Sequence, residues 1–155
     1  MFFITTEFVI LSSLLILPSS LGDLGSGHEN LFNIQHVKSK LFVDPDGKMV
    51  PSQQKAAKFA FLRTTLNYVE IFDPSTKKGF DVENGCSGRN VILFPLRVDA
   101  DNQQFIYNGD KTISSKCNPA KVVAIDFNQH RLFLAEKNPN HLEMYQFDKI
   151  YAGFM

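Results

Sequence analysis

Hydrophobic residues along the chain come in short runs that alternate with polar residues or are interrupted by turns. Segments 59–61, 91–94 and 132–134 show this pattern, and Gly, Asn, Asp and Pro recur between such segments. Short apolar runs bounded by turn residues are typical of β-strands, whereas an amphipathic helix repeats its apolar positions about every 3.6 residues over a longer stretch. Residues 53–58 have the composition of a helical turn or two. The pattern predicts an all-β domain with little helix.

The strand pattern occurs three times along the chain. In each copy a basic residue leads into an apolar strand, at 40–43 (KLFV), 78–82 (KGFDV) and 121–125 (KVVAI). Further along each copy a phenylalanine closes a short motif, at Phe72, Phe105 and Phe147. One unit of this kind has an apolar face too small to bury alone, but three units around a pseudo-threefold axis can enclose a common core.

We therefore expect three repeats, at residues 31–75, 76–119 and 120–155, with the three closing phenylalanines buried in the core. Turn sequences such as DPDG at 44–47 and NGD at 108–110 favour short antiparallel strands. A β-sandwich in which the spacing arises by coincidence is the alternative, and it would also be all-β.

The N-terminal segment has the pattern of an export signal. Residues 8–17 (FVILSSLLIL) carry no charge, and Pro18 and small residues follow them. A bilayer span needs about 20 apolar residues, so this run is too short to cross a membrane, but it matches the apolar region of a signal peptide. We expect a cleavable signal peptide at 1–22, a linker at 23–30 and one domain at 31–155, in a secreted protein without membrane insertion. A buried N-terminal strand or helix is the alternative.

The charges of the chain are balanced, with 16 basic and 16 acidic residues and a formal net charge of zero. A balanced chain has no long-range field that would favour nucleic acid or acidic membranes. We therefore expect no nucleic-acid partner, and recognition that acts at short range.

Two cysteines and four histidines limit the chemistry that the chain can perform. Cys86 and Cys117 would form a disulfide in an oxidising compartment, with two buried free thiols as the alternative. The histidines make none of the close-spaced ligand pairs typical of zinc sites, and none lies in a recognisable nucleophile motif; they stand at positions 28, 36, 130 and 141. We expect no metal, no cofactor and no enzymatic activity.

The middle repeat carries a recognisable order of motifs. GFDV at 79–82, NVILFP at 90–95, NQQF at 102–105 and NGDKTI at 108–113 follow one another along the chain. In order and spacing they resemble the repeat of ricin-B-type lectins, which reads CLDV, VQLW, NQxW and GTI. The resemblance covers residues 79–125, whereas the other two repeats match by spacing and by their closing phenylalanines. It implies a β-trefoil fold and a small secreted lectin.

The resemblance also implies a sugar site in the middle repeat. In such lectins a carboxylate and amides bind the hydroxyls of a sugar, and an aromatic ring stacks on its apolar face, which combines strong charge-assisted hydrogen bonds with a defined apolar contact. Asp81 stands at the carboxylate position, Phe94 at the ring position, and Asn102 and Gln103 at the amide positions. The implied partners are galactose-like or amino-sugar glycans, or glycoproteins that carry them.

The other repeats lack the carboxylate, because we align Asp81 with Val43 in the first repeat and with Ala124 in the third. The middle repeat also departs from the family pattern. Ile92 replaces the usual Gln, Phe replaces Trp at both aromatic positions, and Gly79 and Leu96 stand where the family forms a disulfide within the repeat.

Two alternatives therefore remain open. Asp81 and Asn102 also suit a purely structural role, since in many trefoils of this type these positions brace a turn and a strand end. The whole domain would then bind a protein partner through its loops, as an inhibitor or in an adhesive or coat role. Residues 62–67 and 138–141 are the candidate loops.

Overall fold

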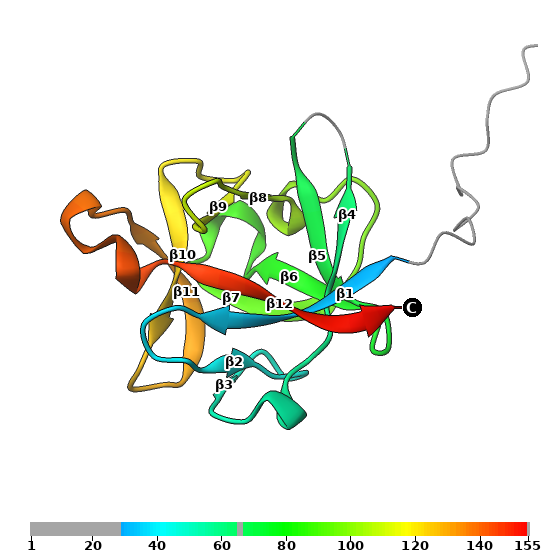
Figure 1. The fold of residues 1–155 in the computed structure, drawn as a ribbon. Coiled ribbons are helices and arrows are strands. Elements are labelled where there is room, and N and C mark those ends of the chain that lie inside the picture. Colours follow the sequence, from blue (N-terminus) through cyan, green and yellow to red (C-terminus); the bar gives the residue numbers. More distant parts are fainter. Residues whose placement is uncertain (1–28, 65–66, 155) are drawn as a thin grey trace, which may run out of the picture.

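The computed structural model describes residues 29–64 and 67–154 (Figure 1). The expected signal peptide and most of the expected linker lie outside the described residues. Within these residues the chain forms twelve strands and four short 3-10 helices, and no helix is long and apolar enough to cross a membrane. The fold is therefore all-β with little helix, as the sequence predicts. One of the helices, η1 at Gln53–Lys55, lies in the segment with helical composition.

The elements follow in this order: β1 (Asn30–His36), β2 (Phe42–Val43), β3 (Met49–Val50), η1, β4 (Ala60–Arg63), β5 (Val69–Asp73), β6 (Lys78–Val82), η2 (Gly85–Ser87), β7 (Asn90–Pro95), η3 (Asp101–Gln103), β8 (Phe105–Tyr107), β9 (Ile113–Ser115), β10 (Lys121–Asp126), β11 (Arg131–Glu136), η4 (Pro139–Met144) and β12 (Phe147–Phe154).

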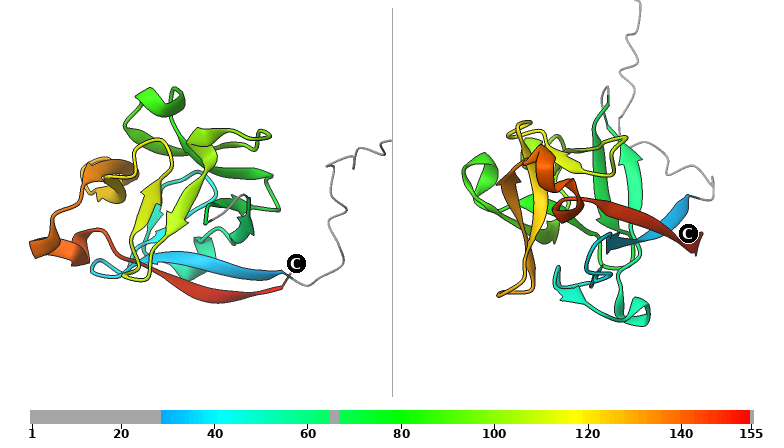
Figure 2. Two further views of the ribbon diagram at one scale, coloured as in Figure 1. Left: turned by 90° about the horizontal axis from the view of Figure 1, so that it is seen from above. Right: turned by 60° about the vertical axis from the view of Figure 1, so that its left-hand side comes forward.

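A ring of antiparallel strands forms the body of the molecule. Strand β12 pairs with β1, β4 with β5, β5 with β8, and β8 with β9. Single bridges from Phe32 to Phe59 and from Thr112 to Gln146 close the ring between β1 and β4 and between β9 and β12. The two ends of the described chain meet in this ring, because β1 and β12 run side by side in every view (Figure 2). A closed ring leaves no strand edge unpaired.

Three hairpins complete the fold, formed by β2 and β3, by β6 and β7, and by β10 and β11. The hairpins also contact one another, through the pair Val91 and Leu132 and through the bridge from Lys48 to Arg131. Each group of four consecutive strands thus supplies two strands of the ring and one hairpin. This is the threefold arrangement of a β-trefoil, and the predicted fold class is confirmed.

The core repeats the same side chains in three copies. Each of the following positions is buried and belongs to one apolar cluster: Ile34, Ile71 and Ile113; Phe59, Phe105 and Phe147; Val43, Val82 and Ile125; Met49, Val91 and Leu132. The members of each trio lie at corresponding places in the three groups of strands. The three groups therefore close around a shared centre, which no single group could cover alone.

The structure corrects one member of the predicted phenylalanine trio. Phe105 and Phe147 are core residues at the start of β8 and β12, but their counterpart is Phe59, which precedes β4. Phe72 lies on β5 opposite Gly79 of β6, and it is buried in a separate small cluster with Leu31 and Ala60.

The error arose because β4 and β5 are neighbouring apolar strands that both carry phenylalanine, so spacing alone does not distinguish them. The short helices do distinguish them, since η1, η3 and η4 precede Phe59, Phe105 and Phe147 respectively. In the structure the repeats run from β1 to β4, from β5 to β8 and from β9 to β12. The predicted boundary of the first repeat, at residue 75, therefore falls one strand too late.

We expect Phe59→Ala to lower the free energy of unfolding by about 3–5 kcal/mol, because it opens a cavity at the centre of the core. Phe127→Ala is the matched control, since Phe127 is 41% exposed and its ring makes an edge contact with His36, so its loss should cost only about 1 kcal/mol. Urea unfolding followed by circular dichroism measures both values. An equal loss in the two variants would contradict the assignment of Phe59 to the central trio.

His36 gives the fold a pH dependence. Its side chain is fully buried, and its ring contacts the Ser39 hydroxyl and the Met144 carbonyl. Burial lowers the pKa of His36 below its usual 6.5, an effect that nearby lysines reinforce. As the pH falls below about 6.5, the unfolded chain takes up a proton that the folded chain resists, so the folded state loses stability.

We expect the free energy of unfolding to fall between pH 7 and pH 5, and His36→Gln to flatten this dependence. His141→Gln is the control, because the His141 side chain is 64% exposed. Denaturant unfolding at a series of pH values tests the expectation. A wild-type stability that stays constant over this range would overturn it.

Candidate functional site

The hairpin of the second repeat places the candidate residues together. Phe80 and Val82 point into the core, so Asp81 between them points to the opposite face of the β6 strand. Helix η3 follows the β7 strand and carries Asn102 and Gln103 back to β6. The structure thus brings together Asp81, Asn102 and Gln103, which are far apart in the sequence.

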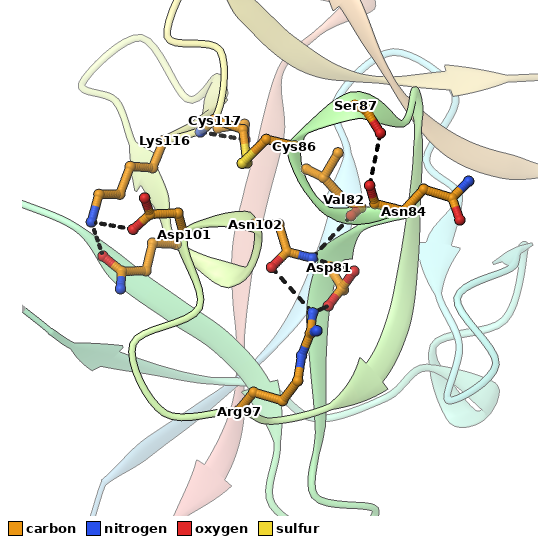
Figure 3. Close-up of a disulfide and its surroundings, with 12 residues drawn as sticks. Asp81, Val82, Asn84, Cys86, Ser87, Arg97, Asp101, Asn102, Lys116 and Cys117 are labelled. Atoms are coloured by element: carbon orange, nitrogen blue, oxygen red, sulfur yellow. Dashed lines mark hydrogen bonds and ion pairs between the residues drawn. A yellow bond between two sulfur atoms is a disulfide. The ribbon is translucent and has the colours of Figure 1, made fainter.

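Asp81 is the centre of a buried hydrogen-bond network. Its Oδ1 accepts a hydrogen bond from Asn102 Nδ2 at 2.8 Å, and its Oδ2 accepts one from Gln103 Nε2 and one from Arg97 Nη2, both at 2.8 Å. Figure 3 shows Asp81, Asn102 and Arg97 converging. The Asp81 side chain is only 4% exposed. Three donors, one of which also forms an ion pair, compensate the buried carboxylate, as such a group requires.

The two amides also hold the backbone around the site. Asn102 Nδ2 donates to the Val82 carbonyl at 3.0 Å, and Gln103 Nε2 donates to the Pro95 carbonyl at 2.9 Å. Gln103 Oε1 accepts a hydrogen bond from the Arg97 amide at 2.8 Å. The network therefore fixes η3 against both strands of the hairpin. This bracing is the structural role that the sequence left open.

Arg97 is the member of the network that sequence reasoning missed. Its Nη2 also donates to Asn102 Oδ1 at 3.1 Å, and its guanidinium lies 5.4 Å from the centroid of the Phe94 ring. Phe94 is 43% exposed, and the Arg97 side chain is half exposed. Arg97 therefore lies between the buried carboxylate and the exposed ring. The sequence feature that could have identified Arg97 is its position, because it is the one basic residue between Phe94 and Asn102.

The other two hairpins carry no carboxylate at the position of Asp81, although one predicted equivalent was wrong. Val43 pairs with Met49 in the core just as Val82 pairs with Val91, so Val43 corresponds to Val82. The counterpart of Asp81 in the first repeat is Phe42. In the third repeat it is Ala124, as the sequence predicts, because Ile125 pairs with Leu132 in the core.

An apolar contact occupies the place of the family disulfide. A Cβ atom on residue 79 would lie 2.7 Å from Leu96 Cδ2 and 3.1 Å from the Ile71 carbonyl oxygen, so a larger residue at this position would have to displace the Leu96 side chain.

The disulfide of this chain lies elsewhere. Cys86 of η2 is bonded to Cys117, which lies between β9 and β10, so the bond links the second repeat to the third (Figure 3). Beside it, Lys116 Nζ lies 2.7 Å from Asp101 Oδ1 and donates to Gln104 Oε1 at 3.0 Å. These contacts hold the η3 end of the site against the third repeat.

The positions of the possible metal ligands and of the histidines can be given for the described part of the chain. No cluster of three or more His, Cys, Asp or Glu side chains that could hold a metal ion occurs within residues 29–64 and 67–154. His36, His130 and His141 lie on separate elements, and His28 lies outside the described residues.

Comparison with known proteins supports the fold. No protein-family profile matches the sequence, and no curated protein matches it. Among solved structures, the chain is similar to a GH43 β-1,3-galactosidase (19% identity, TM-score 0.61), covering 80% of this chain and 27% of the enzyme. It is also similar to the designed threefold-symmetric protein ThreeFoil (15% identity, TM-score 0.63), covering 77% of this chain and 97% of the design.

A third similar structure is the C-terminal half of the earthworm R-type lectin in complex with GalNAc (11% identity, TM-score 0.52), covering 79% of this chain and 99% of the lectin fragment. The chain thus spans about a quarter of the galactosidase but nearly all of the lectin fragment and the design. At these identities the comparisons establish a β-trefoil fold of the kind found in R-type lectins.

We expect Asp81→Ala to lower the free energy of unfolding by about 3 kcal/mol, because it leaves three donors without their acceptor. The control is Asp46→Ala, which removes an exposed carboxylate of the β2–β3 turn. Thermal unfolding measures both. A loss in Asp81→Ala no larger than in Asp46→Ala would show that the network does not brace the hairpin.

Proposed function

We propose that the protein is a carbohydrate-binding protein and that its site lies on the hairpin of the second repeat. The exposed Phe94 ring and the buried Asp81 carboxylate, which both contact Arg97, carry this proposal, with Asn102 and Gln103 as the flanking amides. Two structures of similar fold support it, an R-type lectin half solved in complex with GalNAc and a β-1,3-galactosidase. The expected ligands are galactose-like or amino-sugar glycans, free or on glycoproteins.

Binding at this site requires Arg97 to move. Its guanidinium contacts both groups that a sugar would need, the Asp81 carboxylate and the Phe94 ring. Because the Arg97 side chain is half exposed, it can rotate into solvent without opening the core. Two hydroxyls of the sugar would then replace Nη2 at Asp81 while the C–H face of the sugar stacks on Phe94.

Export from the cell is part of the proposal. Residues 1–22 would act as a cleavable signal peptide, with cleavage after Gly22. The Cys86–Cys117 disulfide is the kind of bond that persists in secreted proteins. The glycans would then be met outside the cell, on a cell or wall surface.

We propose binding without catalysis. Glycoside hydrolysis uses two carboxyl groups on either side of the scissile bond. The Asp81 network contains one carboxylate, which is already paired with Arg97. The similar galactosidase is also much longer than this chain, so the shared part need not be its catalytic part.

The proposal predicts that Phe94→Ala weakens glycan binding about tenfold or more, because the stacking surface is lost. A glycan array identifies the sugar, and calorimetry with that sugar measures the dissociation constant. Phe127→Ala is the matched control, since the two rings are 43% and 41% exposed. Its affinity should equal that of the wild type.

Arg97→Ala tests whether the Arg97 side chain must move away before the sugar binds. If Arg97 competes with the sugar, this variant should bind at least as tightly as the wild type. Weaker binding would mean that Arg97 itself contacts the ligand. No retention of any glycan by the wild-type protein at millimolar sugar would contradict the proposed function and favour a protein partner.

A further inference from the structure

A second candidate site lies at another part of the barrel and shares no residue with the Asp81 network. It is a cavity of about 1000 Å³ lined by residues of β1, β4, β5, β8 and β12 and of the adjoining segments, including Glu29. Figure 1 shows where these strands lie. Its apolar walls include the half-buried rings of Phe32, Phe61 and Tyr107. A cavity of this size is large enough for a small ligand.

The three rings form a fixed cage. Phe61 makes edge-to-face contacts with Phe32, at 6.0 Å between ring centroids, and with Tyr107, at 5.9 Å. The Tyr107 hydroxyl donates a hydrogen bond to the Phe147 carbonyl at 2.8 Å, which holds the third ring in place. The walls are therefore set before any ligand arrives.

A single ammonium group lies against all three rings. Lys149 Nζ lies 5.2 Å from the ring centroid of Phe32, 4.8 Å from that of Phe61 and 4.6 Å from that of Tyr107. Among the described residues Lys149 has no carboxylate or hydrogen-bond partner, because the adjacent Asp148 pairs with Lys111. The π faces stabilise the charge but accept no conventional hydrogen bond, so all three N–H donors remain available.

The lining combines this cation with polar groups. Arg63, Asn30 and Asn67 line the cavity with exposed side chains, and none of these side chains has a hydrogen-bond partner among the described residues. An aliphatic acid would leave the asparagine amides unused, a neutral sugar would leave the ammonium unpaired, and an organic cation would be repelled by Lys149 and Arg63. Glu29 also lines the cavity, so its two basic side chains, Arg63 and Lys149, outnumber its one carboxylate. A ligand that pairs with the excess positive charge, the amides and the rings needs an anionic group, hydroxyls and an apolar face.

We propose that this cavity binds a carboxylated sugar, such as a uronic or a sialic acid. Its carboxylate would bind Lys149, its C–H face would contact Phe61 and Tyr107, and its hydroxyls would bind the Asn30 and Asn67 amides. Charge-assisted hydrogen bonds beside aromatic rings give the selectivity for the acid. This site is independent of the proposed function at Asp81, and either can fail without the other.

The test is a titration of ¹⁵N-labelled protein with methyl β-glucuronide and with a methyl sialoside. Methyl β-glucoside serves as the neutral match of the glucuronide, and hexanoate serves as an acid without hydroxyls. We expect at least one of the acids to shift amide signals around Phe32, Phe61, Tyr107 and Lys149, and the glucoside to shift none of them. Lys149→Gln should weaken binding about tenfold or more, and Lys149→Arg should restore part of it.

Lys121→Gln is the control for loss of a lysine, since Lys121 lies on β10 and its side chain is 35% exposed. It should bind the acid as tightly as the wild type. Shifts centred on the Asp81 network instead would overturn this inference and leave the proposed function standing. Equal binding of the glucoside or of hexanoate in the cavity, or no binding of either acid at millimolar concentration, would also overturn it.

Discussion

The closure of three small strand groups around one set of rings and branched side chains is the constraint on which the molecule depends. Phe59, Phe105 and Phe147 enter the centre from three copies of the same position, each a few residues after a short helix. A group of four strands cannot bury such a face by itself, so the groups are stable only together. The ring of strands that results has no free edge. The sequences of the connecting loops can therefore change without loss of core packing.

The fold could be predicted from the sequence because this constraint requires a similar pattern of residues in each of the three repeats. Basic residues before apolar strands mark β2, β6 and β10, and these three strands were found correctly. The closing trio was only two-thirds right, because Phe72 on β5 and Phe59 before β4 lie in neighbouring strands with similar patterns. A one-residue error of register within β2 gave the wrong counterpart of Asp81 in the first repeat. Strand register depends on pairing partners, which a pattern of single residues does not specify.

The candidate site was partly predictable for a different reason. Asp81, Asn102 and Gln103 occur in a motif order, and the structure joins them in one network. Arg97 could not be inferred in this way, because its role depends on the path of the chain after β7, which returns it over the carboxylate. The cage around Lys149 was also invisible to the sequence, since its rings come from β1, β4 and β8. Contacts between distant strands arise only when the ring closes.

Both candidate sites combine a charged side chain with aromatic rings. The charge that a ligand would meet is a carboxylate at the hairpin and an ammonium group at the cage. At the hairpin a buried carboxylate is covered by a half-exposed arginine, so the charge that would meet a sugar is already neutralised. At the cage the exposed charge is a lysine without an ion pair among the described residues, and the two basic side chains of the lining outnumber its one carboxylate, Glu29. Displacing a bound side chain subtracts from affinity, whereas filling an open set of donors does not. On this physical basis the cage is the better prepared of the two sites for an acidic ligand, and the hairpin network contributes more to the fold.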